Sequence, residues 1–85
     1  MTREEIEKII MSEVMKRASL LGFPATDVNP GIDLMRSGLY DSMAFVDLIV
    51  ALEEKTGTEI DMETVAPKDI ATPQKLRDLI SHHHG

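Results

Sequence analysis

The 85-residue chain contains no cysteine and no tryptophan, and it has only one tyrosine and two phenylalanines. Without cysteine, it can form neither a disulfide framework nor a thiolate zinc site. Histidine occurs only in the last four residues, 82–85, so no serine–histidine pair is available for nucleophilic catalysis. We interpret residues 82–85 as a purification-tag remnant or a disordered tail. The chain also lacks a secretory or transit segment and any apolar run long enough to span a bilayer, which predicts a soluble cytoplasmic protein.

A chain of this length predicts one domain, which we place at residues 1–81. Its core is too small to enclose a deep, preorganised catalytic cleft. The oxygen-bearing side chains of Asp27, Asn29 and Asp33 do not predict a calcium site. Counted from Asp27, the loop has no glycine at its sixth position and has Gly38 instead of glutamate at its twelfth. We therefore predict a protein that is not an enzyme, with no catalytic residues and no metal.

Acidic side chains are concentrated in the middle of the chain. The formal net charge of the whole chain is −6, and residues 41–63, with seven acids against Lys55 alone, also sum to −6. A nucleic acid is not expected as a partner, since its phosphates would be repelled by this segment. A basic protein surface is expected instead. The alternative for the same charges is a solvated acidic face that binds nothing.

Apolar spacing predicts a first helix of about five turns near the N-terminus. Thr2 and Glu5 form a capping box at its start, and Gly22 and Pro24 end it. Its apolar positions are Ile6, Ile9, Ile10, Val14, Ala18 and Leu21. The next residues, to about position 40, show no helical pattern but contain several apolar side chains. We expect them to form an ordered loop that is pinned across the bundle.

A second helix is predicted from about Ser42 to Thr56, ending at Gly57. One apolar stripe along it consists of Phe45, Leu48, Ile49 and Leu52. A second apolar stripe consists of Met43, Val46 and Val50, interleaved with Asp47, Glu53 and Glu54. Two stripes on one helix usually indicate a wide buried face. The alternative is that the second stripe is half exposed and contacts a partner.

The last helix is predicted to begin at Thr72 as N-cap and Pro73 as first helical residue. A short helical turn is predicted around residues 62–66. No segment shows the alternation that is typical of a strand. The predicted fold is all-α, a small four-helix bundle of three main helices and one short helix, with a long ordered loop between the first two main helices.

Ser42 is the residue that points most directly to a function. It stands directly after Asp41 at the predicted start of the second helix, where unpaired backbone N–H groups and the helix dipole favour a phosphate ester on its hydroxyl. Nothing in the sequence activates this serine, so we expect another protein to modify it. The alternative is a helix-terminal serine of purely structural use in an unmodified, acidic interaction module.

The residues around Ser42 resemble the acyl carrier protein family, which includes peptidyl and aminoacyl carrier domains. The matching run is Leu34-Met35-Arg36-Ser37-Gly38-Leu39-Tyr40-Asp41-Ser42-Met43, followed by the acidic helix and Glu59-Ile60. The resemblance implies that a separate phosphopantetheinyl transferase moves 4′-phosphopantetheine from coenzyme A to Ser42, with Asp41 and Met43 beside the attachment point. The thiol of this cofactor would carry cargo as a thioester, which agrees with the absence of cysteine.

The resemblance also implies a monomer that presents its cargo to partner enzymes. Its partner surface would consist of Val46, Asp47, Val50, Glu53 and Glu54, facing basic patches on the transferase, a loading ligase and downstream acyltransferases or synthases. Acyl intermediates of fatty acid, polyketide or other specialised biosynthesis are the expected cargo. However, two residues, Leu39 and Tyr40, separate Gly38 from Asp41, where fatty-acid-synthesis members have one. This spacing looks more like D-alanyl or aminoacyl carriers and specialised acyl carriers, so an aminoacyl or peptidyl carrier is the alternative.

Overall fold

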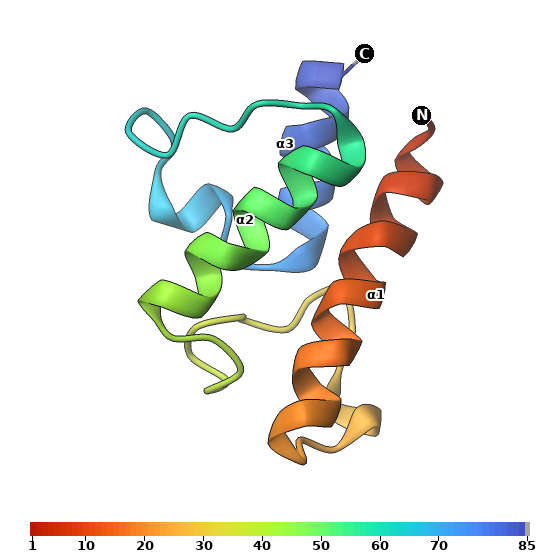
Figure 1. Cartoon of the computed structure of the whole chain (residues 1–85), viewed down its shortest axis with the longest axis vertical. Coiled ribbons are helices and arrows are strands. Elements are labelled where there is room, and N and C mark those ends of the chain that lie inside the picture. The colour runs from red at the N-terminus through yellow and green to blue at the C-terminus, as the bar shows by residue number, and fades with distance from the viewer. Residues whose placement is uncertain (85) are drawn as a thin grey trace.

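The chain folds as a small helical bundle, as the sequence predicted. A computed structural model describes the backbone of residues 1–84 and the side chains of residues 1–82. These residues form three α-helices and two short 3-10 helices, with no strand, and the helices are α1 (Arg3–Leu21), η1 (Ala25–Asp27), α2 (Ser42–Thr56), η2 (Pro67–Asp69) and α3 (Pro73–His84). Figure 1 shows the long connection from α1 to α2 crossing the base of the bundle before the chain enters α2. No helix in this part of the chain is long and apolar enough to cross a membrane.

Short-range capping interactions set the ends of the helices. The Thr2 hydroxyl accepts a hydrogen bond from the Glu5 N–H at 3.1 Å, and the Glu5 carboxylate accepts one from the Thr2 N–H at 3.0 Å. The Thr72 hydroxyl likewise accepts a hydrogen bond from the Lys75 N–H at 3.1 Å, next to Pro73 in the first position of α3. The predicted capping box and the predicted start of the last helix are therefore confirmed.

Apolar side chains from the three helices and the long loop form one core. Its fully buried members are Ile6, Ile10, Val14, Leu34, Leu39, Leu52, Leu76 and Ile80. The α1–α3 pair is also joined by ion pairs of Arg3 with Asp78 (2.5 Å) and of Arg77 with Glu7 (3.2 Å).

Leu21 does not belong to this core, although its spacing predicted that it would, and 49% of its surface is exposed. Gly22 follows it with a left-handed backbone (φ 71°), which turns the chain sharply at the end of α1. The Phe23 N–H then bonds back to the Ala18 carbonyl at 2.8 Å, and Phe23 packs against the core in place of Leu21. A left-handed glycine after the helix thus moves the core position two residues along the chain.

The long loop is pinned to the start of α3, as predicted. The Leu34 N–H donates to the Ala71 carbonyl at 2.9 Å, and the Gln74 N–H donates to the Pro30 carbonyl at 2.9 Å. Within the loop, the Tyr40 N–H donates to the Leu34 carbonyl at 3.0 Å. The loop is therefore ordered by backbone hydrogen bonds as well as by burial.

The predicted short helix is displaced along the chain. Residues 62–66 form hydrogen-bonded turns, in which the Thr64 and Val65 N–H groups both donate to the Asp61 carbonyl at 3.2 Å, and the short helix η2 begins only at Pro67. Proline has no N–H with which to continue a helix, and the residue before it is driven to extended backbone, as Ala66 shows (φ −71°, ψ 141°). The prediction of a helical turn at 62–66 was therefore wrong in position.

The C-terminal residues extend the last helix, because α3 includes the backbone of His82–His84. The predicted tag remnant or disordered tail at 82–85 ends in Gly85, which lies outside the described residues. The origin of this segment, and the domain boundary at residue 81, stay predictions.

Candidate functional site

Asp41, not Ser42, caps helix α2. The backbone of Asp41 is extended (φ −92°, ψ −179°), and its carboxylate accepts a hydrogen bond from the Ala44 N–H at 2.8 Å. Ser42 is therefore the first residue inside the helix, and it is exposed. Its hydroxyl is not used as a cap, and no hydrogen bond joins it to another described side chain or backbone group.

The backbone around Ser42 is suited to an anion. The N–H groups of Ser42 and Met43 belong to the first helical turn, where no carbonyl lies one turn earlier to accept from them. They stand at the positive end of the helix dipole, next to an accessible hydroxyl. A phosphate ester on this hydroxyl would meet donors that the fold itself leaves free.

Leu39 and Tyr40 anchor the turn that leads into Ser42. Leu39 is fully buried and Tyr40 is only 5% exposed. The Tyr40 ring meets the Phe45 ring edge-on, with 6.3 Å between the ring centroids. The two residues between Gly38 and Asp41 therefore fasten the turn that precedes Ser42 to the core.

Arg17 of α1 completes this anchor. Its Nε donates a hydrogen bond to the Leu39 carbonyl at 2.7 Å, and its guanidinium carbon lies 5.6 Å from the centroid of the Tyr40 ring. This contact was not predictable from the sequence, because it joins residues 22 positions apart whose pattern is that of an ordinary helix face and a loop. Arg17 thus holds the segment before Ser42 from the opposite helix.

Tyr40 should titrate far above the usual range of a tyrosine. Burial raises the pKa of its phenol from 10.0 to about 12, although the positive charge of Arg17 opposes the increase. Because it is the only tyrosine, the ultraviolet absorbance of phenolate reports it directly. The folded protein should show a midpoint near 12, and the chain unfolded in denaturant one near 10. Since the unfolded chain releases this proton first, stability should fall as the pH rises through that interval. A midpoint near 10 in the folded protein would show that the phenol is in water.

An apolar groove of about 760 Å³ lies beside Ser42. The sequence did not predict it, because its walls come from the long loop, α2, the segment after α2 and the start of α3. Its apolar lining includes Phe45, Val46, Met62, Val65 and Ile70. Its charged lining consists of Arg36, Lys68 and Lys75, with Asp33 as the single acid. The groove thus combines an apolar floor with a positive rim in a protein that is acidic elsewhere.

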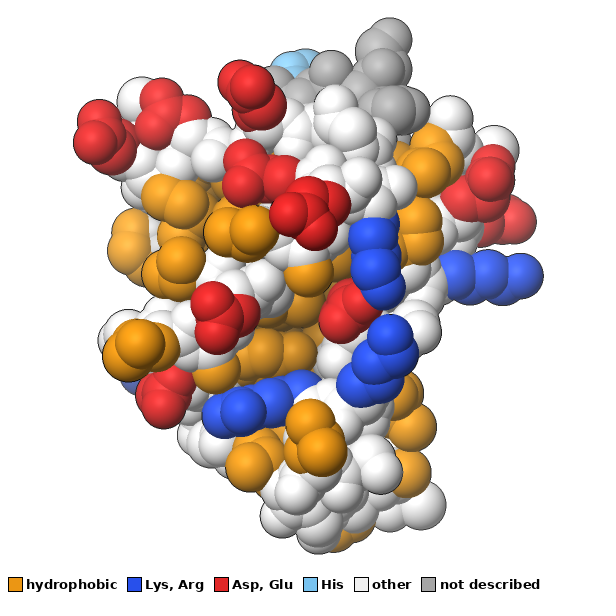
Figure 2. Space-filling model, viewed as in Figure 1, with side chains coloured by type: hydrophobic (Ala, Val, Ile, Leu, Met, Phe, Trp, Pro, Cys, Tyr) orange, Lys and Arg blue, Asp and Glu red, His pale blue; other side chains and the backbone are white. Residues whose placement is uncertain are grey.

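The second apolar stripe of α2 is exposed. Met43 is 81% exposed, Val46 52% and Val50 47%. The interpretation as a wide buried face is therefore wrong, and the alternative of a half-exposed stripe agrees with the structure. The side chains of Asp47 and Glu54 are exposed on the same helix, and Figure 2 shows acidic groups gathered along α2 and the loop after it.

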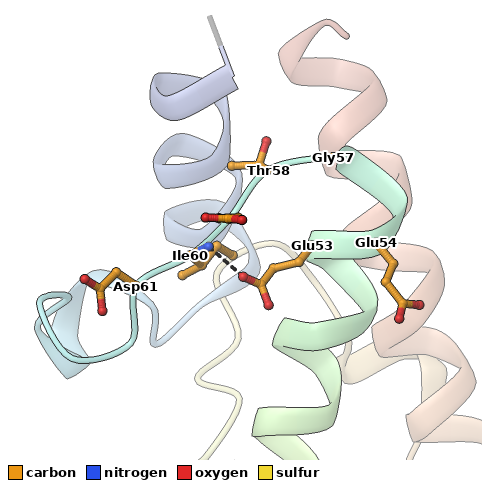
Figure 3. Close-up of a pocket in the computed structure, with 7 residues that line it drawn as sticks. Glu53, Glu54, Gly57, Thr58, Ile60 and Asp61 are labelled. Atoms are coloured by element: carbon orange, nitrogen blue, oxygen red, sulfur yellow. Dashed lines mark hydrogen bonds between the residues drawn. The ribbon is translucent and has the colours of Figure 1, made fainter.

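Glu53 differs from its acidic neighbours. Its carboxylate accepts a hydrogen bond from the Ile60 N–H at 2.7 Å, which ties the loop after α2 back to the helix (Figure 3). The sequence suggested that Glu53 is a free charge on a partner surface. Its bond to Ile60 shows that it also stabilises the fold. It lies in a second, shallow hollow with Glu54, Glu59 and Asp61.

The carboxylates of this second hollow do not meet at one point. Figure 3 shows Glu54 and Asp61 on opposite sides of Glu53, with their side chains pointing away from each other. Among the described residues, no group of histidine, aspartate or glutamate side chains is arranged to hold a metal ion. The hollow is therefore an acidic surface and not a coordination site.

A small helical bundle that presents an unpartnered serine at the start of an acidic helix has the architecture of a carrier protein. The family model for the phosphopantetheine attachment site matches residues 16–80, which is most of the chain, and the chain belongs to this family. Its cofactor is covalently attached 4′-phosphopantetheine, and carrier domains of this kind work with a phosphopantetheinyl transferase and partner enzymes and are not catalytic themselves. No solved structure gives a significant match to the chain.

Proposed function

We propose that Ser42 is the attachment site of 4′-phosphopantetheine and that the protein carries acyl groups as thioesters on this arm. The observation that supports Ser42 is its exposed position, with a hydroxyl that has no hydrogen-bond partner among the described residues and that adjoins the free N–H groups of the first turn of α2. Asp41 contributes by capping the helix in place of Ser42, which leaves the serine oxygen free for the phosphodiester. Met43, exposed beside it, borders the attachment point.

Intact mass tests this proposal directly. The purified chain, incubated with coenzyme A and a broad-specificity phosphopantetheinyl transferase, should gain the mass of a single phosphopantetheine group. If the folded chain gains no mass, the unmodified interaction module becomes the better description.

The groove beside Ser42 supports an acyl cargo over an aminoacyl one. Its apolar floor would take methylene groups out of water, at about 0.8 kcal/mol for each one fully buried. An aminoacyl thioester has an ammonium group close to its carbonyl, and the apolar floor would take this charged group out of water at a cost. The spacing Gly38-Leu39-Tyr40-Asp41-Ser42 is the feature that favours the alternative of a D-alanyl, aminoacyl or peptidyl carrier.

Loading the arm with two different cargoes should separate these alternatives. A transferase can attach octanoyl- or alanyl-phosphopantetheine from the matching coenzyme A thioester. The octanoyl form should unfold at a higher temperature than the unloaded form, by about 4–8 °C if roughly 1 kcal/mol of burial is gained. The alanyl form should gain nothing. Equal midpoints for the two loaded forms would remove the support that the groove gives to an acyl cargo.

We also propose that Val46 and Val50 are apolar contacts for partner enzymes, within an acidic rim that includes Asp47 and Glu54. Their exposure supports this, since about half of each valine surface is open to solvent on a helix that begins at Ser42. Partners with basic patches, such as the transferase, a loading ligase and downstream acyltransferases or synthases, match the charge of this surface. Glu53 would add its charge to the rim while it holds Ile60.

Val46→Ala and Glu54→Gln should slow modification by the transferase in different ways. Truncation of an apolar contact at a desolvated interface costs about 1–2 kcal/mol, so Val46→Ala should lower the rate at low and high salt alike. Glu54→Gln should lower it chiefly at low salt, because exposed charges act mainly on association. Glu54 is preferable to Glu53 here, since loss of the Glu53 bond to Ile60 would also disturb the fold. An unchanged rate for Val46→Ala would show that the transferase docks elsewhere.

A further inference from the structure

Basic side chains that line the groove lack acidic partners. Elsewhere in the described residues, Arg3, Lys16, Lys55 and Arg77 each pair with a carboxylate, whereas Lys8 and Arg17 do not. Arg36, Lys68 and Lys75 do not, although acids outnumber bases in this chain by 15 to 9. No described group accepts a hydrogen bond from the side chain of Arg36 or Lys68.

The one acid of the groove is already used by its own loop. The carboxylate of Asp33 accepts hydrogen bonds from the Met35 N–H at 3.1 Å and from the Arg36 N–H at 2.7 Å. Lys75 is also held, because its Nζ donates to the Lys68 carbonyl at 2.8 Å. This bond steadies the backbone at Lys68, and the head groups of Arg36 and Lys68 stay available for an anion.

Ser42 lines the same groove as these cations. A phosphodiester on its hydroxyl carries a full negative charge at neutral pH, and it would place an anion in the groove that these cations also line. Guanidinium and ammonium groups are the usual partners of phosphate oxygens, and arginine can bind two of them at once. An acidic partner protein would be a less suitable occupant, since α2 and the loop after it would repel it.

We propose that Arg36 and Lys68 form an anion seat for the phosphodiester at Ser42, which directs the prosthetic arm along the apolar groove instead of outward into solvent. This inference rests on the proposed function, because the phosphodiester exists only if Ser42 is modified. The ion pairs in this seat are weak, because both cations are exposed to solvent and are screened by salt. The arm can therefore leave the groove when a partner enzyme takes it.

The test compares the apo and holo proteins of the wild type, Arg36→Gln, Lys68→Gln and Lys8→Gln. Lys8 is the matched control, since it is also exposed and pairs with no carboxylate in the described part of the chain, but it lies on α1 and does not line the groove. Modification of every protein is first verified by intact mass, and its fold by circular dichroism. The readouts are the change in backbone amide NMR shifts from apo to holo, the phosphorus NMR shift of the arm, and the change in unfolding midpoint at low and high salt.

In the wild type and Lys8→Gln, attachment of the arm should shift the amide signals of residues 62–71. It should also raise the unfolding midpoint at low salt, and this increase in the midpoint should disappear at high salt. In Arg36→Gln and Lys68→Gln, both effects should be largely lost and the phosphorus shift should move toward that of the unfolded holo chain. Equal effects in all four proteins, or shifts confined to Ser42 and its neighbours, would overturn the seat while the proposed attachment stands. A chain that gains no mass would overturn both.

Discussion

Replacement of Ser42 by alanine should abolish modification by the transferase completely and leave the fold almost unchanged. The hydroxyl has no hydrogen bond to any described residue, and Asp41 still caps α2 in the variant. Alanine is also a better helix former than serine, so the first turn of α2 loses no stability. Intact mass after incubation with coenzyme A measures the modification, and circular dichroism measures the helices.

Ser12→Ala is the matched control for this change, because Ser12 is an exposed serine on α1, away from the start of any helix. This variant should be modified as fast as the wild type. A Ser42→Ala protein that still gains the mass of the cofactor would show that another residue is the attachment site. A Ser42→Ala protein that loses its helical spectrum would show instead that the hydroxyl is part of the fold.

Tyr40→Ala should strongly destabilise the fold, because the ring is buried beside the site. Deletion of a buried aromatic ring commonly costs about 3–5 kcal/mol of unfolding free energy, and here the variant also loses the edge-on contact with Phe45 and the contact with Arg17. For a domain of this size, a loss of about 3 kcal/mol should lower the unfolding midpoint by more than about 10 °C. Thermal or urea unfolding measures it.

Tyr40→Phe keeps the ring and serves as the control, and it should stay within about 1 kcal/mol of the wild type. Modification by the transferase should also slow in Tyr40→Ala, at temperatures where the variant is folded, because the turn before Ser42 loses its anchor. If Tyr40→Ala and Tyr40→Phe unfold at the same midpoint, the ring does not fasten this turn. The structural explanation for the second residue between Gly38 and Asp41 would then fail.

Helix boundaries were predictable because capping is a local interaction. Thr2 with Glu5, Gly22 and the pair Thr72-Pro73 act within one turn of the chain, and the structure places all of them where the sequence predicted. The short helix was misplaced because its position depends on Pro67, which interrupts a run of apolar spacing that otherwise looks helical. Leu21 was misassigned for a related reason, since the turn at Gly22 substitutes Phe23 for it.

The sequence by itself determined the fold class, the three main helices, the place of Ser42 directly after Asp41 and the acidity of the segment that follows. All of these follow from residue type and spacing along a few turns of chain. Only the tertiary structure decided that the stripe of Met43, Val46 and Val50 is exposed. The bond from Ile60 to Glu53 and the bond from Arg17 to Leu39 also depend on it. The groove and its three cations likewise depend on tertiary structure, because the lining residues come from four segments of the chain. Burial and long-range contacts are set by which surfaces the packed helices cover, and periodicity within one helix does not contain that information.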